Sequence, residues 1–66
     1  MNWTKKCRLL AEKSQTDIAK ALGMHINTYA RKEKEEDKFT IAEVKIIARE
    51  TGGNAADIFL PETLQM

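Results

Sequence analysis

Residues 14–33, SQTDIAKALGMHINTYARKE, carry the signals of two short helices joined by a sharp turn. Ser14 is a good N-cap, and Asp17 follows three residues later, where free backbone amides and the helix dipole favour a negative charge. Gly23 stands where the first helix must end, because a residue without a Cβ readily adopts the left-handed conformation that closes a helix. Met24 is apolar and can pack back on the preceding turn. The stretch therefore predicts a helix, a chain reversal and a second helix.

The second helix of this stretch has two different sides. It begins at about Ile26, and a rotation of about 100° per residue divides its residues into two sets. One side carries Ile26, Tyr29 and Glu33, and the other carries Asn27, Arg31 and Lys34. A glycine turn between a helix of small residues and a helix displaying Asn, Thr and Arg is the layout of a helix-turn-helix, whose second helix enters the major groove of DNA.

The pattern resembles the lambdoid-phage Cro and repressor group, also called the xenobiotic-response-element (XRE) family of regulators. The residues that stand at the family's spacing are Ser14-Gln15, Ile18-Ala19, Leu22-Gly23 and Glu33. The match is close over residues 14–33 and loose over the rest of the chain. The resemblance implies an all-α, compact five-helix domain of the lambda-repressor-like DNA-binding fold, with the helix-turn-helix at its second and third helices. We expect the DNA-binding domain to cover residues 1–60 and a C-terminal tail to cover residues 61–66.

Periodicity and capping predict where the first three helices lie. The first is expected from about Trp3 to Glu12, with an apolar stripe of Trp3, Cys7, Leu10 and Ala11. The second is expected over about residues 15–22, and the third from about Ile26 to Glu35 or Glu36. The charged run at residues 34–38 is typical of a frayed, solvated helix end.

The C-terminal half carries a strong helix start. Residues 40–43, Thr-Ile-Ala-Glu, form a capping box of the S/T-x-x-E type. The buried side of this fourth helix is expected to consist of Ile41, Val44, Ile47 and Ala48, and the helix ends at Gly52 and Gly53. Asn54 with Asp57 then predicts a short fifth helix, which holds Ile58 and Phe59 and which Pro61 ends.

Length and composition exclude several classes of protein. The 66 residues allow one domain with a small core, because a chain of this size buries only about 60% of its unfolded surface. No apolar run approaches the roughly 20 residues of a membrane span, and the N-terminus is too charged for a signal peptide, so we expect a cytoplasmic protein. Cys7 is the one cysteine of the sequence and His25 its one histidine, so we expect neither a disulfide within the chain nor a metal site. No nucleophile and base pair or phosphate loop is present, so we expect neither an enzyme nor a cofactor.

The charges of the chain are unevenly distributed. Residues 1–34 hold eight Lys/Arg and three Asp/Glu, a net charge of +5, whereas residues 35–66 hold three Lys/Arg and seven Asp/Glu, a net charge of −4. This polarity suits a protein that presents its N-terminal half to phosphate and its acidic half to solvent. The alternative is that these are ordinary charges that keep the surface hydrated.

Four residues of the third helix are candidates for contact with DNA bases. Asn27 can pair bidentately with adenine, and Arg31 with guanine. Thr28 can contact either a base or a phosphate. Ile26 can lie against a thymine methyl group, but core packing suits it equally well, because it stands on the border of both sides.

Four further residues are candidates for contact with phosphate. Gln15 matches the family glutamine that meets the DNA backbone through its side chain and the start of the second helix. His25 occupies the family's usual Ser/Thr cap position and either touches a phosphate or is an exposed turn residue. Lys34 and Lys38 are electrostatic candidates, as are other lysines whose orientation the sequence leaves open: Lys5, Lys6 and Lys13.

The resemblance also implies an internal ion pair between Arg8 and Glu33, which would tie the first helix to the end of the third. Periodicity independently places Glu33 on the side of Tyr29; the alternative is that both charges are solvated. Tyr29 is expected in the core, with its hydroxyl bonded or at the edge. Lys32 replaces a commonly apolar residue, so its stem is expected to cover the core while its ammonium reaches water. Cys7 is expected to be a small buried hydrophobe.

These observations favour a sequence-specific regulator that binds double-stranded DNA, Cro-like or repressor-like, from a phage, prophage or similar mobile element. One reading helix covers few base pairs, so we expect a homodimer on an operator with symmetric half-sites about 34 Å apart. The dimer contact would involve Phe59, Leu60, Leu64 and Met66, unless Phe59 instead covers the core. No small-molecule effector is expected. The alternative function is a small helical protein-interaction module, such as an antitoxin or a phage-encoded inhibitor of a host protein.

Overall fold

Four α-helices and two short 3₁₀ helices make up the regular structure of residues 2–59, the part of the chain that the computed structural model describes. The α-helices are α1 (Trp3–Leu10), α2 (Gln15–Leu22), α3 (Ile26–Lys34) and α4 (Ile41–Thr51), and the 3₁₀ helices are η1 (Glu36–Lys38) and η2 (Ala55–Phe59). The predicted all-α class is confirmed. The predicted count of five helices is corrected to four α-helices in this range, because the segment expected to form the fifth is η2. The predicted tail, residues 61–66, lies outside the described residues.

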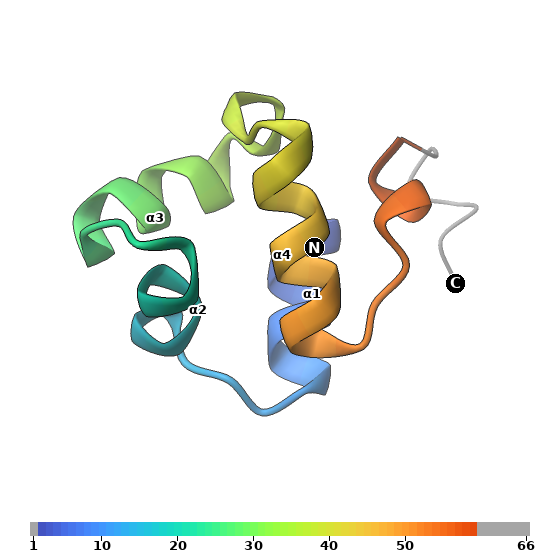
Figure 1. The fold of residues 1–66 in the computed structure, drawn as a ribbon, viewed down its shortest axis with the longest axis horizontal. Helices are drawn as coiled ribbons and strands as arrows, with labels where there is room; N and C mark the ends of the chain where they lie inside the picture. The colour runs from blue at the N-terminus through green and yellow to red at the C-terminus, as the bar shows by residue number, and fades with distance from the viewer. Residues whose placement is uncertain (1, 60–66) are drawn as a thin grey trace.

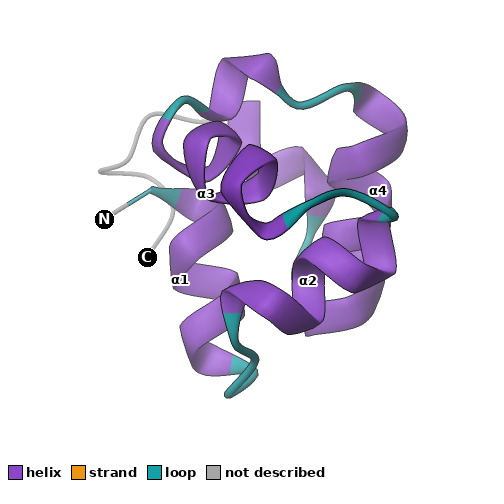
Figure 2. Ribbon diagram, turned by 90° about the vertical axis from the view of Figure 1, so that its left-hand side faces the viewer, coloured by secondary structure: helices purple, strands orange, loops and turns teal. Residues whose placement is uncertain are grey.

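The helices surround one small core. α2 and α3 lie toward one end of the molecule, α1 and α4 form its middle, and η2 lies toward the other end (Figure 1). α2 packs against both α3 and α4, and α1 packs against α4 and η2. Figure 2, viewed from the α2 and α3 side, shows the two helices joined by their short loop. α3 is therefore held on an outer side of the domain by the helix that precedes it.

Tyr29 lies at the centre of the core, with no measurable exposure. It shares the core with buried hydrophobic residues from the other three α-helices and from the loop before α4: Trp3, Ile18, Ala19, Phe39, Val44 and Ile47. The ring of Phe39 lies 6.0 Å from that of Tyr29, centroid to centroid. Phe39 was not predicted as a core residue, because it precedes a helix and belongs to no periodic stripe.

Two helices end earlier than predicted. α1 ends at Leu10 and not at Glu12, because Glu12 adopts φ 56°, a left-handed conformation that a helix cannot contain. α3 ends at Lys34, because Glu35 takes φ −123° and ψ 76°, outside the helical region. Residues 36–38 of the charged run then form η1 in place of a frayed helix end.

Two residues predicted to be buried are exposed. Leu10 is 77% exposed, although it lies on the stripe of Trp3 and Cys7. It borders a hollow that is also lined by Gly52 and Gly53, and glycines have no side chains with which to cover it. Ile41 is 60% exposed, because at the first position of α4 it lies at the rim of a second hollow and not beneath a neighbouring element.

The predicted start of α4 is confirmed in detail. The hydroxyl of Thr40 accepts a hydrogen bond from the amide of Glu43, and the carboxylate of Glu43 accepts one from the amide of Thr40 at 2.9 Å. Each bond satisfies an amide that the first helical turn leaves without a partner inside the helix. α4 therefore begins at a defined residue, with Val44 and Ile47 turned into the core.

Candidate nucleic-acid interface

Local hydrogen bonds define both ends of α2, the helix before the turn. The capping box of Ser14 and Asp17 starts α2, as predicted. Gly23 ends it in the left-handed conformation, with φ 69°, and the amide of Met24 then donates to the carbonyl of Ala19 at 3.0 Å. Met24 packs on the core. The orientation of α3 relative to α2 thus depends on a short and well-bonded loop.

His25 caps the start of α3. Its Nδ1 accepts a hydrogen bond from the amide of Asn27 at 3.0 Å, which replaces the Ser or Thr oxygen expected at this position. An imidazole nitrogen that accepts carries no proton, so a neutral His25 has its proton on Nε2. The side chain is exposed, and this N–H is a donor at the first turn of α3.

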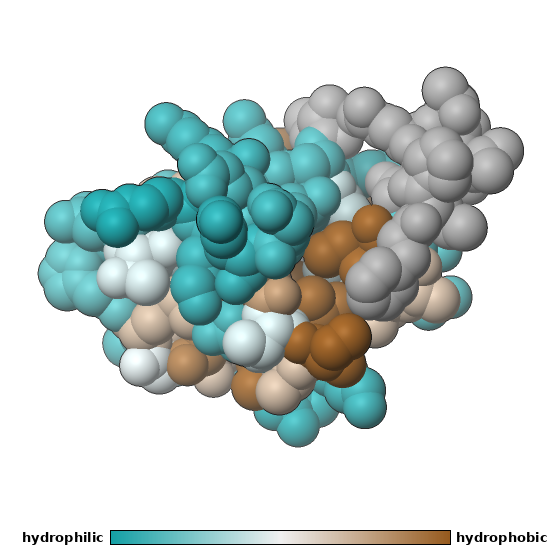
Figure 3. All heavy atoms as spheres, turned by 90° about the horizontal axis from the view of Figure 1, so that it is seen from above, coloured by the Kyte–Doolittle hydropathy of each residue, from teal (hydrophilic) through white to brown (hydrophobic). Residues whose placement is uncertain are grey.

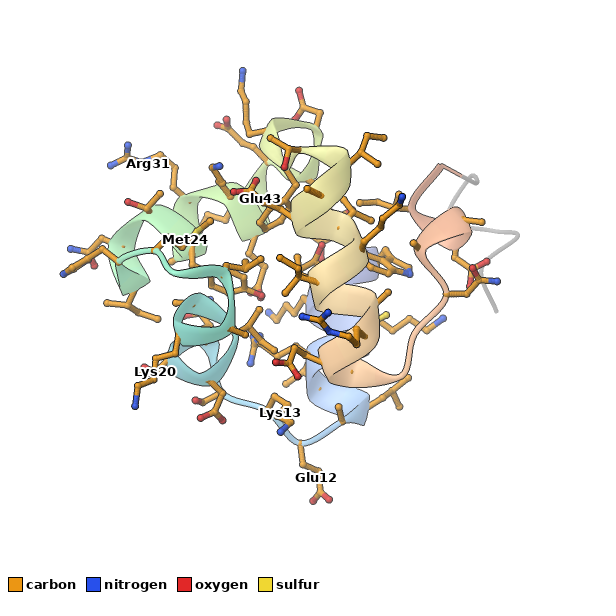
Figure 4. The ribbon with its side chains drawn as sticks, in the orientation of Figure 1. Glu12, Lys13, Lys20, Met24, Arg31 and Glu43 are labelled. Atoms are coloured by element: carbon orange, nitrogen blue, oxygen red, sulfur yellow. The ribbon has the colours of Figure 1, made fainter. Side chains whose placement is uncertain are left out.

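α3 separates its residues into an anchored side and an exposed side. Tyr29 and Glu33 are buried, whereas Asn27, Thr28 and Arg31 are exposed. Arg31 points away from the domain (Figure 4). Within residues 2–59 these three exposed side chains have no hydrogen-bonding or ionic partner. Ile26, for which both roles were open, is partly buried and packs against the core, while part of its surface stays exposed.

Glu33 is the centre of a hydrogen-bond network that holds α3 against α1 and α2. Nε of Arg8 donates to its Oε2 at 2.8 Å, and Nη2 of Arg8 donates to its Oε1 at 3.2 Å. Nε2 of Gln15 donates to Oε1 at 3.0 Å, and the hydroxyl of Tyr29 donates to Oε2 at 2.6 Å. Arg8 also donates to the carbonyl of Lys13. Arg8 and Glu33 are therefore brought together in the pairing that the resemblance implied.

The network decides the ionisation of its members. Burial raises the pKa of Glu33, but hydrogen bonds from Arg8, Tyr29 and Gln15 more than offset it, so the pKa lies below its usual value. The hydrogen bond to Glu33 raises the pKa of Arg8. Burial, followed by the hydrogen bond to Glu33, raises the pKa of Tyr29 well above its ordinary value of 10.0. Glu33 is therefore a carboxylate, Arg8 a cation and Tyr29 a neutral donor at neutral pH.

A helix-turn-helix family model, HTH_3, matches residues 5–58, which is most of the chain. The chain belongs to this XRE and lambda-repressor-like helix-turn-helix family. Membership identifies a DNA-binding domain of the kind found in transcription regulators, a family that is not typically enzymatic. Comparisons with curated proteins and with solved structures gave no significant match.

The predicted phosphate contacts of this helix-turn-helix domain lie at three places along the chain: the start of α2, the start of α3, and the end of α3 with η1. Gln15 begins α2 and is half-buried, with its amide tied to Glu33. His25 precedes the first residue of α3, and Lys34 is the last residue of that helix. Lys38 follows Lys34 in the chain and lies in η1. His25 and both lysines are exposed, and neither lysine has an ion-pair partner among residues 2–59.

A second ion pair of the helix-turn-helix domain was not predicted. Nζ of Lys32 lies 3.1 Å from Oε1 of Glu43, which joins α3 to the start of α4. Burial raises the pKa of Glu43, but hydrogen bonds from the amide of Thr40 and from Lys32 more than offset it, so the pKa lies below its usual value. Glu43 points toward the space between the two helices (Figure 4). The capping box was the only available signal, and it predicts the cap without revealing Lys32.

Asn2 supports the same end of α3 from the other side. Its side chain caps α1 by accepting from the amide of Lys5 at 2.9 Å, and its Nδ2 donates to the main-chain carbonyl of Glu33. The domain therefore holds the C-terminal half of α3 through both the side chain and the backbone of Glu33.

Residues 2–59 hold neither a candidate metal-ligand cluster nor a candidate membrane-spanning helix. No group of three His, Cys, Asp or Glu side chains in this range could hold a metal ion. Among the same residues, no helix combines the length and the apolar character needed to cross a bilayer.

Proposed function

We propose that this helix-turn-helix domain is a sequence-specific regulator of transcription, of the Cro-like or repressor-like kind, that binds double-stranded DNA and belongs to a phage, prophage or similar mobile element. α3 enters the major groove. The observation that carries the proposal is the contrast between the two sides of α3. Tyr29 and Glu33 hold one side rigidly, while the other presents side chains with unused hydrogen-bonding groups.

The exposed side of α3 has the chemistry of base recognition. The amide of Asn27 matches the donor and acceptor edge of adenine, and the guanidinium of Arg31 matches the two acceptors of guanine. Thr28 contacts a base or a phosphate. Ile26 offers its exposed part to a thymine methyl group while the rest of its side chain supports the helix. These side chains approach DNA without breaking any bond inside the domain.

Phosphate contacts would fix the position of α3 in the groove. The Nε2–H of His25 is a donor beside the first turn of α3, and Gln15 lies at the start of α2, where the helix dipole favours an anion. Lys34, the last residue of α3, and Lys38 in η1 add positive charge at the other end of the helix. The hydrophilic surface over the α3 end of the molecule is visible in Figure 3.

We place a homodimer contact at a hollow of about 450 Å³, which is lined by the hydrophobic side chains of Phe39, Ile41, Val44 and Ile58 and by the acidic residues Glu36 and Asp37. Hydrophobic side chains gather toward the η2 end of the face in Figure 3. A second copy bound here leaves the exposed side of each α3 uncovered. Two α3 helices could then enter successive major grooves, on half-sites about 34 Å apart. The sequence predicted this contact at Phe59, Leu60, Leu64 and Met66. The side chain of Phe59 and the other three residues lie outside the described part of the structure.

Selection of bound duplexes from a random pool, followed by salt titration on the selected and a scrambled duplex, tests the proposal. We expect symmetric half-sites and an affinity that falls steeply with salt, because bound phosphates release counterions. Equal affinity for selected and scrambled duplexes would contradict sequence-specific recognition. Little affinity for any duplex would instead favour a protein-interaction module such as an antitoxin or an inhibitor.

A further inference from the structure

Lys32 of α3 and Glu43 of α4 form an ion pair that the proposed DNA contacts do not use. Nζ of Lys32 donates to Oε1 of Glu43 at 3.1 Å and to Oε2 at 3.3 Å. The lysine side chain is 26% exposed and the glutamate side chain 19%, so salt screens this pair less than it screens a fully exposed one. The two residues are 11 positions apart, and the pair closes the corner at which the chain passes from α3 through η1 to α4.

The carboxylate of Glu43 is already held in place by its own helix. Its Oε1 accepts a hydrogen bond from the amide of Thr40 at 2.9 Å, and the hydroxyl of Thr40 accepts one from the amide of Glu43. These two bonds form the capping box of α4, and they set the orientation of the carboxylate. Glu43 is therefore a fixed acceptor at the start of α4, to which Lys32 can tie α3.

Lys32 holds a different side of α3 from the side that Glu33 holds. At about 100° per residue, Lys32 lies between Thr28 on the exposed side and Tyr29 on the buried side. Glu33 lies a further 100° around the helix, and its carboxylate is bonded to α1 and α2. A single polar anchor lets a helix roll about that contact, whereas two anchors on different sides restrict the roll.

The rotation of α3 matters because it alone aims the exposed side chains. Within residues 2–59, Thr28 and Arg31 have no hydrogen-bonding or ionic partner that would orient them. Arg31 directly precedes Lys32 and extends away from the domain, while Glu43 lies in the space between α3 and α4 (Figure 4). A binding site must hold its groups within about 0.5 Å and 10 to 20° of the productive geometry. A roll of that size would move the guanidinium of Arg31 off its base edge.

We propose that Lys32 is a positioning residue for DNA recognition, which acts through Glu43 to fix the rotation of α3 and thereby the aim of Arg31. This role rests on the proposed function and concerns a residue that the proposed function does not place at the DNA. The family position of Lys32 is commonly apolar, so the family resemblance does not supply this contact. Because the lysine acts through a carboxylate, removing either charge should have the same consequence, although the two removals change the net charge in opposite directions.

Discrimination between the selected duplex and duplexes that differ from it at one base pair tests this role. Lys32→Met introduces an apolar side chain, and Glu43→Gln keeps an oxygen for the amide of Thr40, since Gln also serves in a capping box. Each variant should lose about three- to tenfold of the discrimination at the base pair that Arg31→Ala identifies, because the guanidinium is present but poorly aimed. Lys32→Arg, which keeps two donors for the carboxylate, should retain the wild-type discrimination.

Salt dependence separates positioning from a direct phosphate contact. Lys32→Met should leave the slope of log affinity against log salt unchanged, whereas the loss of a phosphate contact lowers its magnitude by about 0.9. The double variant Lys32→Met/Glu43→Gln should lose no more discrimination than either single variant. Lys45→Met and Glu50→Gln change exposed residues of α4 and are the charge-matched controls.

Thermal unfolding of each variant separates positioning from a purely structural role. Lower stability with wild-type discrimination in Lys32→Met and Glu43→Gln would overturn the role of Lys32, and so would a slope lowered by about 0.9 in Lys32→Met. Should Lys32→Met not fold, the discrimination of Glu43→Gln decides. All of these results would leave sequence-specific binding by the wild type intact. If the wild type has no preference among duplexes, the proposed function and the role of Lys32 both fail.

Discussion

Arg8 and Glu33 meet inside the domain through two hydrogen bonds, of 2.8 and 3.2 Å, although 25 positions of the chain separate them. This pair connects α1 to the end of α3, so the helix that carries the exposed Asn27 and Arg31 is fixed to a part of the chain outside the helix-turn-helix. Its two-pronged geometry resists rotation as well as separation.

Removal of Arg8 is expected to destabilise the domain strongly. Arg8→Met leaves the carboxylate of Glu33 buried without its counter-charge, which should lower the free energy of unfolding by about 3 to 5 kcal/mol. Urea denaturation measures the loss, with Lys20→Met, an exposed lysine of α2, as the control. In the double variant Arg8→Met/Glu33→Gln the loss should be smaller than the sum of the single losses. Strict additivity would mean that the two groups do not interact.

The stability of the domain should depend on pH through Glu33. Its pKa in the folded state is below the ordinary 4.5, so its carboxylate contributes stability that is complete above about pH 5 and is lost as the pH falls through the folded-state value. The free energy of unfolding should therefore decline below about pH 4.5. In this pH range the free energy of unfolding of the Glu33→Gln variant should decline less steeply than that of the wild type, whatever the stability of the variant at neutral pH. If the free energy of unfolding of the variant fell with pH in parallel with that of the wild type, Glu33 would not be the source of the pH dependence.

Helix starts were predictable because they depend on residues that are close in sequence. Ser14 and Asp17 cap one another across three residues, and Thr40 and Glu43 do the same. The end of α1 had no such signal, since Glu12 adopts its left-handed conformation without being a glycine. The exposure of Leu10 could not be predicted either. Periodicity shows which residues of a helix share one side, but it does not show whether another element covers the end of that side.

The site was predictable where one helix supplies both partners. Tyr29 and Glu33 are one turn apart in α3, so their shared side follows from periodicity. The pairing of Arg8 with Glu33 came from the family resemblance, and periodicity supported only the placement of Glu33. The bond between Gln15 and Glu33 depends on how α2 lies against α3, and the pair of Lys32 and Glu43 depends on the path of the chain through η1. No local pattern encodes these distances.

Gly53 should resist substitution because of its neighbour on α1. A Cβ at this position would lie 2.6 Å from Sγ of Cys7, too close for non-bonded atoms. Gly53→Ala should therefore cost about 1 to 3 kcal/mol of stability, measured by thermal or urea unfolding. Adding Cys7→Ala removes the sulfur and should recover part of that loss. Gly52→Ala, which is strained by its φ of 75° and not by crowding, should gain nothing from the same second substitution.

Base recognition by α3 should be separable from folding. Asn27→Ala and Arg31→Ala remove exposed side chains, so thermal unfolding should change little. Each variant should lose about 1 to 3 kcal/mol of discrimination at one base pair of the half-site, which is roughly 5- to 150-fold in relative affinity. Competition between duplexes that differ at one position measures this loss, with exposed Arg49→Ala on α4 as the control. Wild-type preferences in both variants would show that α3 does not recognise bases through these groups.

Self-association should depend on Ile41 if two copies meet at the hollow beside it. Ile41 is 60% exposed in the single chain, so Ile41→Ser should change its stability by no more than about 0.5 kcal/mol. The same substitution should weaken the dimer in sedimentation equilibrium and reduce the advantage of an operator with two half-sites over one with a single half-site. Leu10→Ser is the matched control, because Leu10 is 77% exposed but borders a different hollow. If Leu10→Ser weakens the dimer and Ile41→Ser does not, the contact lies on the α1 side of the domain.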